Sequence, residues 1–241
     1  MISIVFPTLN EEAYIGESIR ALKSKMTLPY EIIVSDGKST DKTVSIAKTA
    51  GADKVVEYKG TARQNIAINR NAGGAVAKGE FVVFMDADSR INDPDAHFTH
   101  ALSHFEKDPS LVALTTRLKA YPGTETFGDH IIWNMMSFNL RMMNNVLHKG
   151  ESTGKFQMIR KTAFDKLKGF REDLICREDA DMFLRLSKIG KTYWDPHLTT
   201  FHSSRRAHKI GWVKLYWIWV VNTIWVILFN KAKVKEWTVI R

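Results

Sequence analysis

Short apolar runs alternate with stretches of helical periodicity along the first half of the chain. The apolar runs fall at residues 2–6, 31–35, 54–57 and 81–85. Between them, apolar positions recur at helical spacing over residues 12–24, 40–50 and 61–77. Short strands that alternate with helices of about ten residues predict βαβ units. We therefore expect an α/β fold with a mostly parallel, Rossmann-like sheet flanked by helices.

Polar clusters come directly after three of these predicted strands, at residues 7–12, 36–41 and 86–88. Parallel strands joined by right-handed crossovers end at the same edge of a sheet. Ligands of open α/β sheets bind beyond the carboxyl ends of the strands. We therefore expect the three clusters to lie together and to contain the binding site.

The second half of the chain has a less regular pattern. It predicts a helix over residues 96–107, a strand over 111–118 and a helix over 178–188. Residues 130–148 are largely apolar but are interrupted by asparagine and arginine, which is typical of an amphipathic helix. Such a helix packs into a core or lies in a membrane interface, and both alternatives stay open.

The C-terminal segment is strongly apolar over residues 215–229, and it reaches the length of a membrane span when it is extended back to residue 210. Five of the seven tryptophans lie between Trp212 and Trp237, as in the aromatic belt of a membrane interface. The segment is consistent with one spanning helix, with a re-entrant or interfacial helix, or with a buried helix of a soluble domain.

Charge is concentrated in the same C-terminal region. The chain has a net charge of +9, and residues 205–241 carry eight Lys/Arg and one Glu, a net +7. Basic residues around an apolar, tryptophan-rich run favour anionic lipid over nucleic acid as a partner. We predict a catalytic domain over residues 1–204, which includes the 130–148 helix. A basic membrane-associated tail would follow over 205–241, with its apolar segment at 210–229.

The remaining features of the composition favour the cytoplasmic face of the membrane. Cys176 is the single cysteine, so no disulfide framework forms, and a reducing compartment is the simplest interpretation. The apolar N-terminus is short and lacks a basic region, so it is interpreted as a strand and not as a signal peptide.

Asp86 and Asp88 end an apolar strand in the pattern Asp-x-Asp. Two carboxylates at this spacing can turn toward one hard cation, and Mg²⁺ or Mn²⁺ prefers oxygen ligands and keeps positions open for phosphate oxygens. Solvated turn acids would give the same pattern. His202 is a candidate third metal ligand.

The other polar clusters each allow two interpretations. Asp36 either belongs to an ordinary turn or accepts hydrogen bonds from a nucleobase. Asn10 and Glu11 either bind likewise, or Asn10 caps a helix that begins at Glu11. Arg205 and Arg206 either hold a diphosphate or form a basic patch beside the membrane.

Glu178 and Asp179 open a predicted helix, where the helix dipole stabilises carboxylates. Asp181 and Arg185 form an expected i,i+4 surface pair on that helix. Asp179 lies outside that pair, so it is a candidate base that takes a proton from an acceptor hydroxyl.

As an ordered series, these motifs resemble glycosyltransferase family 2, whose members have the GT-A fold. The resemblance extends over residues 2–195. The matching stretches in the first half of the chain are residues 5–11, 32–37 (with Ser39, Asp41 and Thr43), 62–63, 71–73, 77–81 and 84–88. In the second half they are Gly154-x-Phe156 and residues 159–160, 169–170 and 178–179.

The resemblance implies a role for each site residue. Asp88 would bind the metal, Asp86 would approach the donor sugar or ribose, and Asp179 would be the base of an inverting displacement with Glu178 beside it. Residues implied near the nucleotide are Pro7, Asn10, Glu11 and Asp36 in the nucleoside pocket and Arg63 and Asn71 near base or phosphate. Arg205 and Arg206 look like a reduced form of the arginine motif of cellulose-synthase-like enzymes. Arg90 stands where some polyprenyl-phosphate mannosyltransferases carry Gln, so the third metal ligand is open.

The sequence therefore predicts a metal-dependent, inverting nucleotide-sugar glycosyltransferase, that is, a hexosyltransferase. Resemblance to the mannosyltransferases favours GDP-mannose as donor, with a UDP-sugar as the alternative. The acceptor would be a membrane lipid-linked saccharide or polyprenyl phosphate. A hydroxyl acceptor needs a base whereas a lipid phosphate does not, so Asp179 tilts the prediction toward the saccharide. A non-catalytic membrane scaffold with the same fold is a further alternative.

Overall fold

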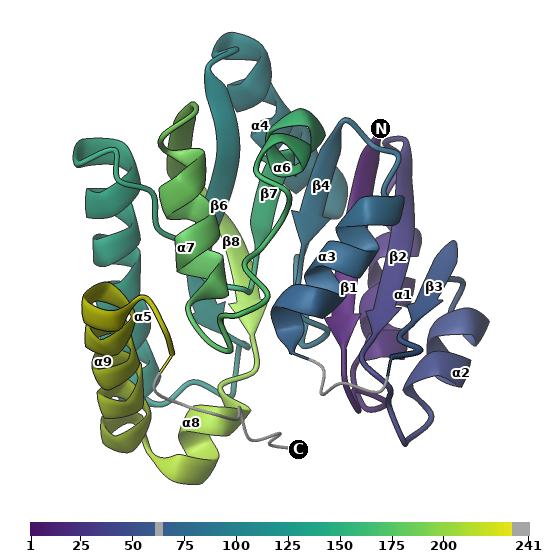
Figure 1. Ribbon diagram of the computed structural model, residues 1–241. Helices are drawn as coiled ribbons and strands as arrows, with labels where there is room; N and C mark the ends of the chain where they lie inside the picture. The colour runs from purple at the N-terminus through teal and green to yellow at the C-terminus, as the bar shows by residue number, and fades with distance from the viewer. Residues whose placement is uncertain (61–64, 233–241) are drawn as a thin grey trace.

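One eight-stranded sheet forms the centre of the protein in a computed structural model that describes residues 1–60 and 65–232 (Figure 1). The strands are β1 (Ile2–Thr8), β2 (Tyr30–Asp36), β3 (Lys54–Glu57), β4 (Phe81–Phe84), β5 (Ser89–Arg90), β6 (Leu111–Ala120), β7 (Gln157–Arg160) and β8 (Lys191–His202). The helices are α1 (Ile15–Lys23), α2 (Thr43–Thr49), α3 (Ile66–Val76), α4 (Pro94–Lys107), α5 (Phe127–Arg141), α6 (Lys161–Lys166), α7 (Glu178–Leu186), α8 (Arg205–Ile210) and α9 (Trp212–Phe229), with a π-helical turn at Met142–Val146.

The strands are ordered β3-β2-β1-β4-β7-β6-β8-β5. β1 pairs in parallel with β2 and β4, and β6 pairs in parallel with β8. β7 lies antiparallel between β4 and β6, which makes those two strands run in the same direction. The carboxyl ends of β1, β2, β4, β6 and β8 therefore share one edge of the sheet. This arrangement was predicted for the polar clusters that follow β1, β2 and β4.

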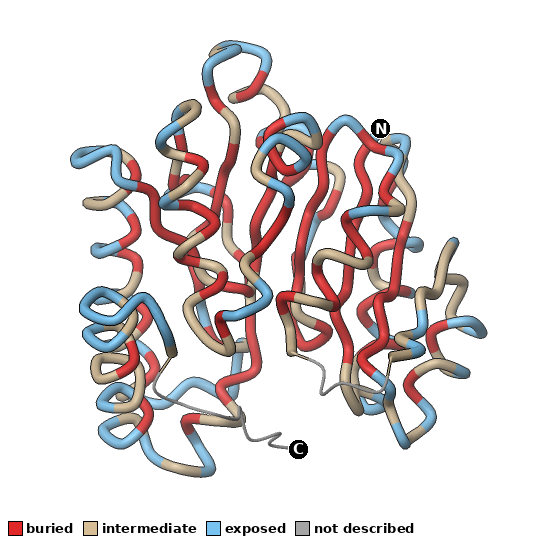
Figure 2. Tube along the Cα trace, viewed as in Figure 1, coloured by how far each residue is buried: buried red, intermediate tan, exposed pale blue. Residues whose placement is uncertain are grey.

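Both faces of the sheet are buried (Figure 2), because successive side chains of a strand point to opposite faces and each face meets helices. Ile4 and Phe6 of β1 pack with helices α1, α2 and α4 in one core cluster. Val5 packs with α3, α6 and α7 in the other. Burial on both faces explains why the strands appear as continuous apolar runs and not as alternating ones.

Pro7 does not end the first strand, contrary to the expectation from its missing N–H. The carbonyl of Val5 accepts from the N–H of Met85, just beyond β4, and the carbonyl of Thr8 accepts from the N–H of Gly37, just beyond β2. Pro7, two residues after Val5, therefore faces the β4 side, where the pairing of β1 with β4 has already ended at Val5. No ladder bond is lost, so the strand continues to Thr8.

Helices α1 and α2 begin three residues later than predicted. The preceding residues instead tie the loop after β1 to the loop after β2. For example, the Glu11 N–H donates to Thr43 Oγ1 at 2.8 Å.

The pattern missed β5, β7, α6, α8 and the long strand β8. β8 is interrupted by a bulge, because Thr116 pairs with Asp195 whereas the next residue, Arg117, pairs with Thr199. Pro196 lies in this bulge, where its missing N–H costs no ladder bond. The break hides the periodicity of the strand from sequence inspection.

The predicted amphipathic helix is α5, and it begins with a capping box of Thr126 and Asp129. Trp133 and Leu140 are buried, with Trp133 packed against the end of β6. Helix α9 lies beside α5 at the same side of the molecule (Figure 1), and Trp212 meets Trp133 at 5.3 Å between ring centroids. Only Leu215 and Asn222 of α9 are buried, so the alternative of a buried soluble helix is wrong.

Candidate active site

Two aspartates and a histidine meet at the carboxyl edge of the sheet. Asp86 and Asp88 follow β4, and His202 ends β8. Their ligand atoms all lie within 4.8 Å of one another. His202 Nε2 is 3.3 Å from Asp88 Oδ1, and Arg205 Nε is 3.2 Å from Asp88 Oδ2. The tertiary structure thus joins the Asp-x-Asp pair to the histidine suggested as a third ligand.

The protonation states suit a divalent cation. Burial alone would raise the pKa of Asp88, but His202, Lys155 and Arg205 together hold that pKa well below its usual range. Burial lowers the pKa of His202, which favours the neutral, metal-binding imidazole. Asp86 Oδ1 and His202 Nδ1 are buried atoms without a hydrogen-bond partner. Two carboxylates and an imidazole with such atoms fit Mn²⁺ or Mg²⁺.

Arg205 links the N-terminal loop to the C-terminal region. Its Nη2 lies 2.8 and 3.0 Å from the two carboxylate oxygens of Glu11, and its guanidinium lies 4.7 Å from the ring centroid of Tyr14. Burial raises the pKa of Glu11 despite this contact. Burial and the adjacent Arg205 charge lower the pKa of Arg206. Arg205 therefore contacts the acidic pair directly, and Arg206 lies close enough to feel the charges of Asp88 and Asp86.

Arg70 and Lys155 also belong to this site, and sequence reasoning missed both. Arg70, on α3, is 1% exposed, with Nη1 2.5 Å from Glu178 Oε1 and Nη2 3.5 Å from Asp86 Oδ1. Lys155 Nζ lies 2.6 Å from Asp86 Oδ2. A side chain at Gly154 would place its Cβ 2.1 Å from Arg70 Nη2, so the glycine of Gly154-x-Phe156 makes room for the arginine. In the sequence, that glycine was the one feature that could have indicated a close approach of another side chain at this position.

Glu178 and Asp179 begin α7 beside Arg70 but differ in environment. Glu178 is buried, and its burial and the neighbouring Asp179 charge raise its pKa to about 7, which the contact with Arg70 offsets only in part. Asp179 is half-buried, and one of its oxygens accepts the Ala180 N–H at 2.8 Å. Arg177, in the left-handed conformation (φ 65°), precedes the helix and contacts Glu151 at 3.0 Å. The more accessible Asp179 is the better placed of the two carboxylates to meet a ligand.

The loops after β1 and β2 form a second, adjoining group. Asp36 is buried, and its carboxylate accepts from Thr8 Oγ1 at 3.0 Å and from the Ser39 N–H at 2.8 Å. Asn10 adopts φ 58°, and its side-chain oxygen accepts the Thr40 N–H at 2.8 Å. The suggestion that Asn10 caps the first helix is wrong, because Tyr14 occupies the N-cap.

Some predicted residues lie elsewhere. The side-chain amide of Asn71 donates to the Phe170 carbonyl and to Glu172, and its oxygen accepts the Phe170 N–H at 2.7 Å, so it holds that turn. Arg63 lies outside the described residues. Asp181 and Arg185 form the predicted surface pair at 2.7 Å.

Comparison with known proteins places the chain among sugar-transferring enzymes. Residues 3–168 match the family described as Glycosyl transferase family 2. The chain is 27% identical over 193 residues to a chondroitin synthase of Pasteurella multocida. The match covers 79% of this chain and 19% of that relative, so the chain spans about a fifth of the relative's length. It is 31% identical over 93 residues, or 37% of the chain and 30% of the relative, to a GalNAc(5)-diNAcBac-PP-undecaprenol beta-1,3-glucosyltransferase of Campylobacter jejuni.

Among solved structures, a mannosyltransferase of Pyrobaculum calidifontis in complex with GDP-Man and Mn²⁺ superposes with a TM-score of 0.65. The two chains are 19% identical, and the match covers 84% of this chain and 56% of the other. At this level of identity the likeness shows a shared fold.

Proposed function

The chain belongs to glycosyl transferase family 2 and has the GT-A fold, and from this premise we propose that it is an inverting, metal-dependent glycosyltransferase. The donor we propose is GDP-mannose, and the acceptor a lipid-linked saccharide at the cytoplasmic face of a membrane. One observation carries the proposal: Asp86, Asp88 and His202 lie together beside Arg205, and Arg70 joins this group to Glu178 at the start of α7.

The donor half of the site would handle the leaving group. Asp88, Asp86 and His202 would hold Mn²⁺ or Mg²⁺, which supplies Lewis-acid stabilisation of the departing diphosphate. Arg205 and Arg206 would contact the same phosphates, since a guanidinium matches their geometry. Lys155, already 2.6 Å from Asp86, adds a further positive charge. The nucleoside would lie along Pro7, Asn10, Glu11 and Asp36.

The acceptor half would activate the nucleophile. An acceptor hydroxyl attacks the anomeric carbon from the face opposite the diphosphate, the bond from that carbon to the diphosphate oxygen breaks, and the configuration inverts. Asp179 takes the hydroxyl proton. Arg70 and Glu178 keep the start of α7 against Asp86, so that the base and the donor site stay at a fixed separation.

Two comparisons support the choice of substrates. The Pyrobaculum structure contains GDP-Man and Mn²⁺, and the Campylobacter relative is named for an undecaprenol-linked acceptor. A UDP-sugar is the competing donor. Turnover in detergent, with GDP-mannose, UDP-glucose and UDP-GlcNAc offered separately together with polyprenyl-linked acceptors, tests the proposal. We expect nucleotide release from GDP-mannose that needs Mn²⁺ or Mg²⁺ and stops with EDTA. Release from a UDP-sugar alone would replace the donor, and no release or binding of any donor would leave the scaffold alternative.

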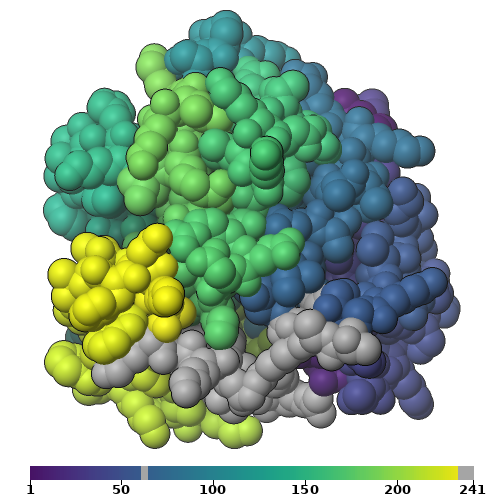
Figure 3. Space-filling view, viewed as in Figure 1, coloured from purple at the N-terminus to yellow at the C-terminus, as the bar shows by residue number. Residues whose placement is uncertain are grey.

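Helices α5 and α9 present a joint apolar surface that suits the membrane partner. Phe138 of α5 and Trp217 of α9 are each 66% exposed. Further exposed apolar side chains on the two helices are Phe127, Ile131, Met135, Val213, Tyr216, Ile224, Ile227, Leu228 and Phe229. Both helices occupy the same side of the molecule in the space-filling view (Figure 3). An apolar patch of this kind marks an interaction surface.

Contacts at both ends hold α9 along the catalytic domain. At its start, Trp212 Nε1 donates to Asp129 Oδ1 at 3.1 Å, and His208 Nε2 lies 2.7 Å from Asp129 Oδ2. After its end, Arg171 Nη1 donates to Asn230 Oδ1 at 2.5 Å. In the described part of the chain, α9 is the one helix long and apolar enough to span a membrane. Because these contacts hold both ends of α9 against the catalytic domain, we propose that α9 lies in the membrane interface with α5, with the nearby Lys209 and Lys214 close to anionic headgroups.

Replacing Trp217 or Phe138 by Glu is expected to weaken binding to vesicles of phosphatidylglycerol and phosphatidylcholine about tenfold. Each variant loses apolar area that the membrane would bury and gains a negative charge. Co-sedimentation measures the partition constant, and Leu184→Glu, an exposed leucine of α7, is the matched control. Alkaline carbonate should release the wild-type protein. Retention in carbonate would indicate a spanning helix, and unchanged binding of both variants would rule out the joint surface.

A further inference from the structure

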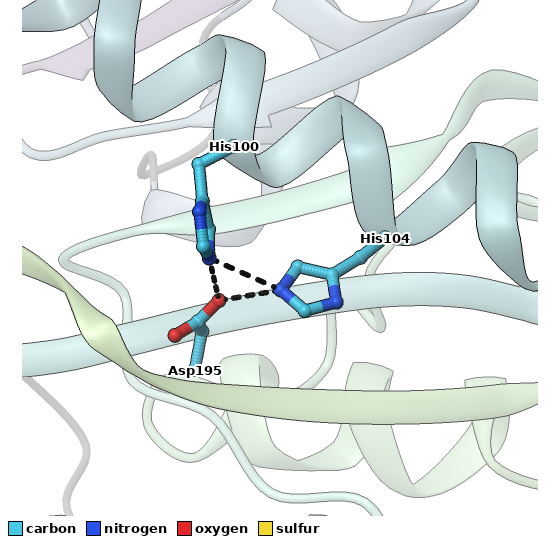
Figure 4. Close-up of side chains that lie close together, drawn as sticks. All are labelled: His100, His104 and Asp195. Carbon is cyan, nitrogen blue, oxygen red and sulfur yellow. Dashed lines mark hydrogen bonds and ion pairs between the residues drawn. The ribbon is translucent and has the colours of Figure 1, made fainter.

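A second cluster of metal-binding side chains lies outside the active site. His100 and His104 project from α4 toward Asp195 of β8 (Figure 4). Asp195 and His202 pair with Thr116 and Ala120 of β6, four residues apart, so the two clusters are separated by about 13 Å along the sheet. The mechanism proposed above uses none of these three side chains.

The three ligand atoms form a compact triangle. His100 Nε2 lies 3.0 Å and His104 Nε2 lies 2.7 Å from the same oxygen, Asp195 Oδ2, and the two nitrogens are 3.3 Å apart. Residues four apart on a helix share one face, which lets both rings reach the same point. A tetrahedral zinc ion with ligands at about 2.0–2.1 Å separates those ligands by about 3.3 Å. The observed triangle needs shifts of only tenths of an ångström to match.

The surroundings orient these ligands. Asp195 is fully buried, and its other oxygen, Oδ1, accepts the His197 N–H at 2.7 Å, which fixes the carboxylate. Ligand carboxylates of metal sites are typically held in this way. The side chains of His100 and His104 are 44% and 27% exposed, so an ion can enter from solvent and a water can complete the coordination.

We propose that His100, His104 and Asp195 bind one zinc ion, which joins α4 to β8. Two imidazoles and one carboxylate form a set that prefers zinc over Mg²⁺, which takes oxygen ligands. The ion would fasten α4 at the β8 bulge, on the strand that ends at His202. Its role is therefore to stabilise the strand that delivers an active-site residue, and it takes no part in the reaction.

Cobalt substitution and zinc binding test the proposal on the untagged, full-length protein in detergent after chelator dialysis. With excess Mg²⁺ present, we expect one equivalent of Co²⁺ to give the visible absorption bands of a four-coordinate site, and Zn²⁺ to displace it. Zn²⁺ should also raise the thermal midpoint of unfolding, because it binds the folded state. His100→Gln and His104→Gln keep a hydrogen-bonding group, and each should weaken Zn²⁺ binding at least 100-fold and remove the thermal shift.

Two controls separate this cluster from others. His130→Gln changes an exposed histidine of α5 and should bind zinc as the wild type does. Asp88→Asn should also retain the ion, because it alters the other cluster. Unchanged zinc affinity in His104→Gln, loss of the cobalt bands in Asp88→Asn, or no thermal effect of zinc on the wild type would each overturn the proposal. The last result would leave a hydrogen-bonded histidine pair only.

Discussion

Asp88→Asn is expected to lower donor turnover by about 10³-fold or more. The variant would lose an anionic group of the proposed metal site. A catalytic metal is worth several kcal/mol of transition-state stabilisation, and about 4 kcal/mol corresponds to 10³-fold in rate. It also leaves His202 and Arg205 without the carboxylate that they now contact. Nucleotide release measured over a range of Mn²⁺ concentrations checks this result, and high Mn²⁺ should restore only part of the activity.

Asp165→Asn is the matched control for this prediction, because Asp165 forms an exposed pair with Lys161 on α6, and its turnover should equal that of the wild type. Far-UV circular dichroism establishes that both variants fold. Turnover of Asp88→Asn within tenfold of the wild type, at any Mn²⁺ concentration, would remove Asp88 from the metal site.

Asp179→Asn should reduce kcat by about 10²- to 10⁴-fold while the KM for the donor stays near its wild-type value. The reason is that Asp179 would act on the acceptor proton and not on the donor. Asp181→Asn, two residues further on the same helix and paired with Arg185, is the control and should retain activity. The prediction depends on the acceptor. A lipid phosphate is already an anion, so full activity of Asp179→Asn with polyprenyl phosphate would identify that acceptor and contradict the saccharide.

The same variant has a consequence for stability that does not depend on activity. The pKa of Glu178 is raised from 4.5 to about 7, partly by the charge of Asp179. Between these pH values the folded protein binds more protons at Glu178 than the unfolded chain does, so its contribution to the free energy of unfolding falls as the pH rises. Asp179→Asn removes one cause of the shift. Urea unfolding at pH 5 and pH 8 should therefore show a smaller loss of stability between these pH values in Asp179→Asn than in the wild type.

Local sequence determined much of the catalytic half. The apolar runs of β1, β2 and β4 were identifiable because a parallel strand buried on both faces must be apolar throughout. The positions of Asp36, Asp86 and Asp88 followed from the strand ends, since parallel strands deliver their carboxyl ends to one edge. The apolar, basic character of the tail was likewise visible, because it depends on composition alone.

Only the tertiary structure decided which of these groups become partners. Arg70 meets Glu178 across 108 residues, and Arg205 meets Glu11 across 194. No local period specifies such contacts, since they depend on the antiparallel insertion of β7 and on the bulge that hides β8. The docking of α9 against the catalytic domain likewise rests on contacts of Trp212 and Asn230 with distant residues. Periodicity reports which side of an element is buried, whereas the packing of distant elements selects what that side is buried against.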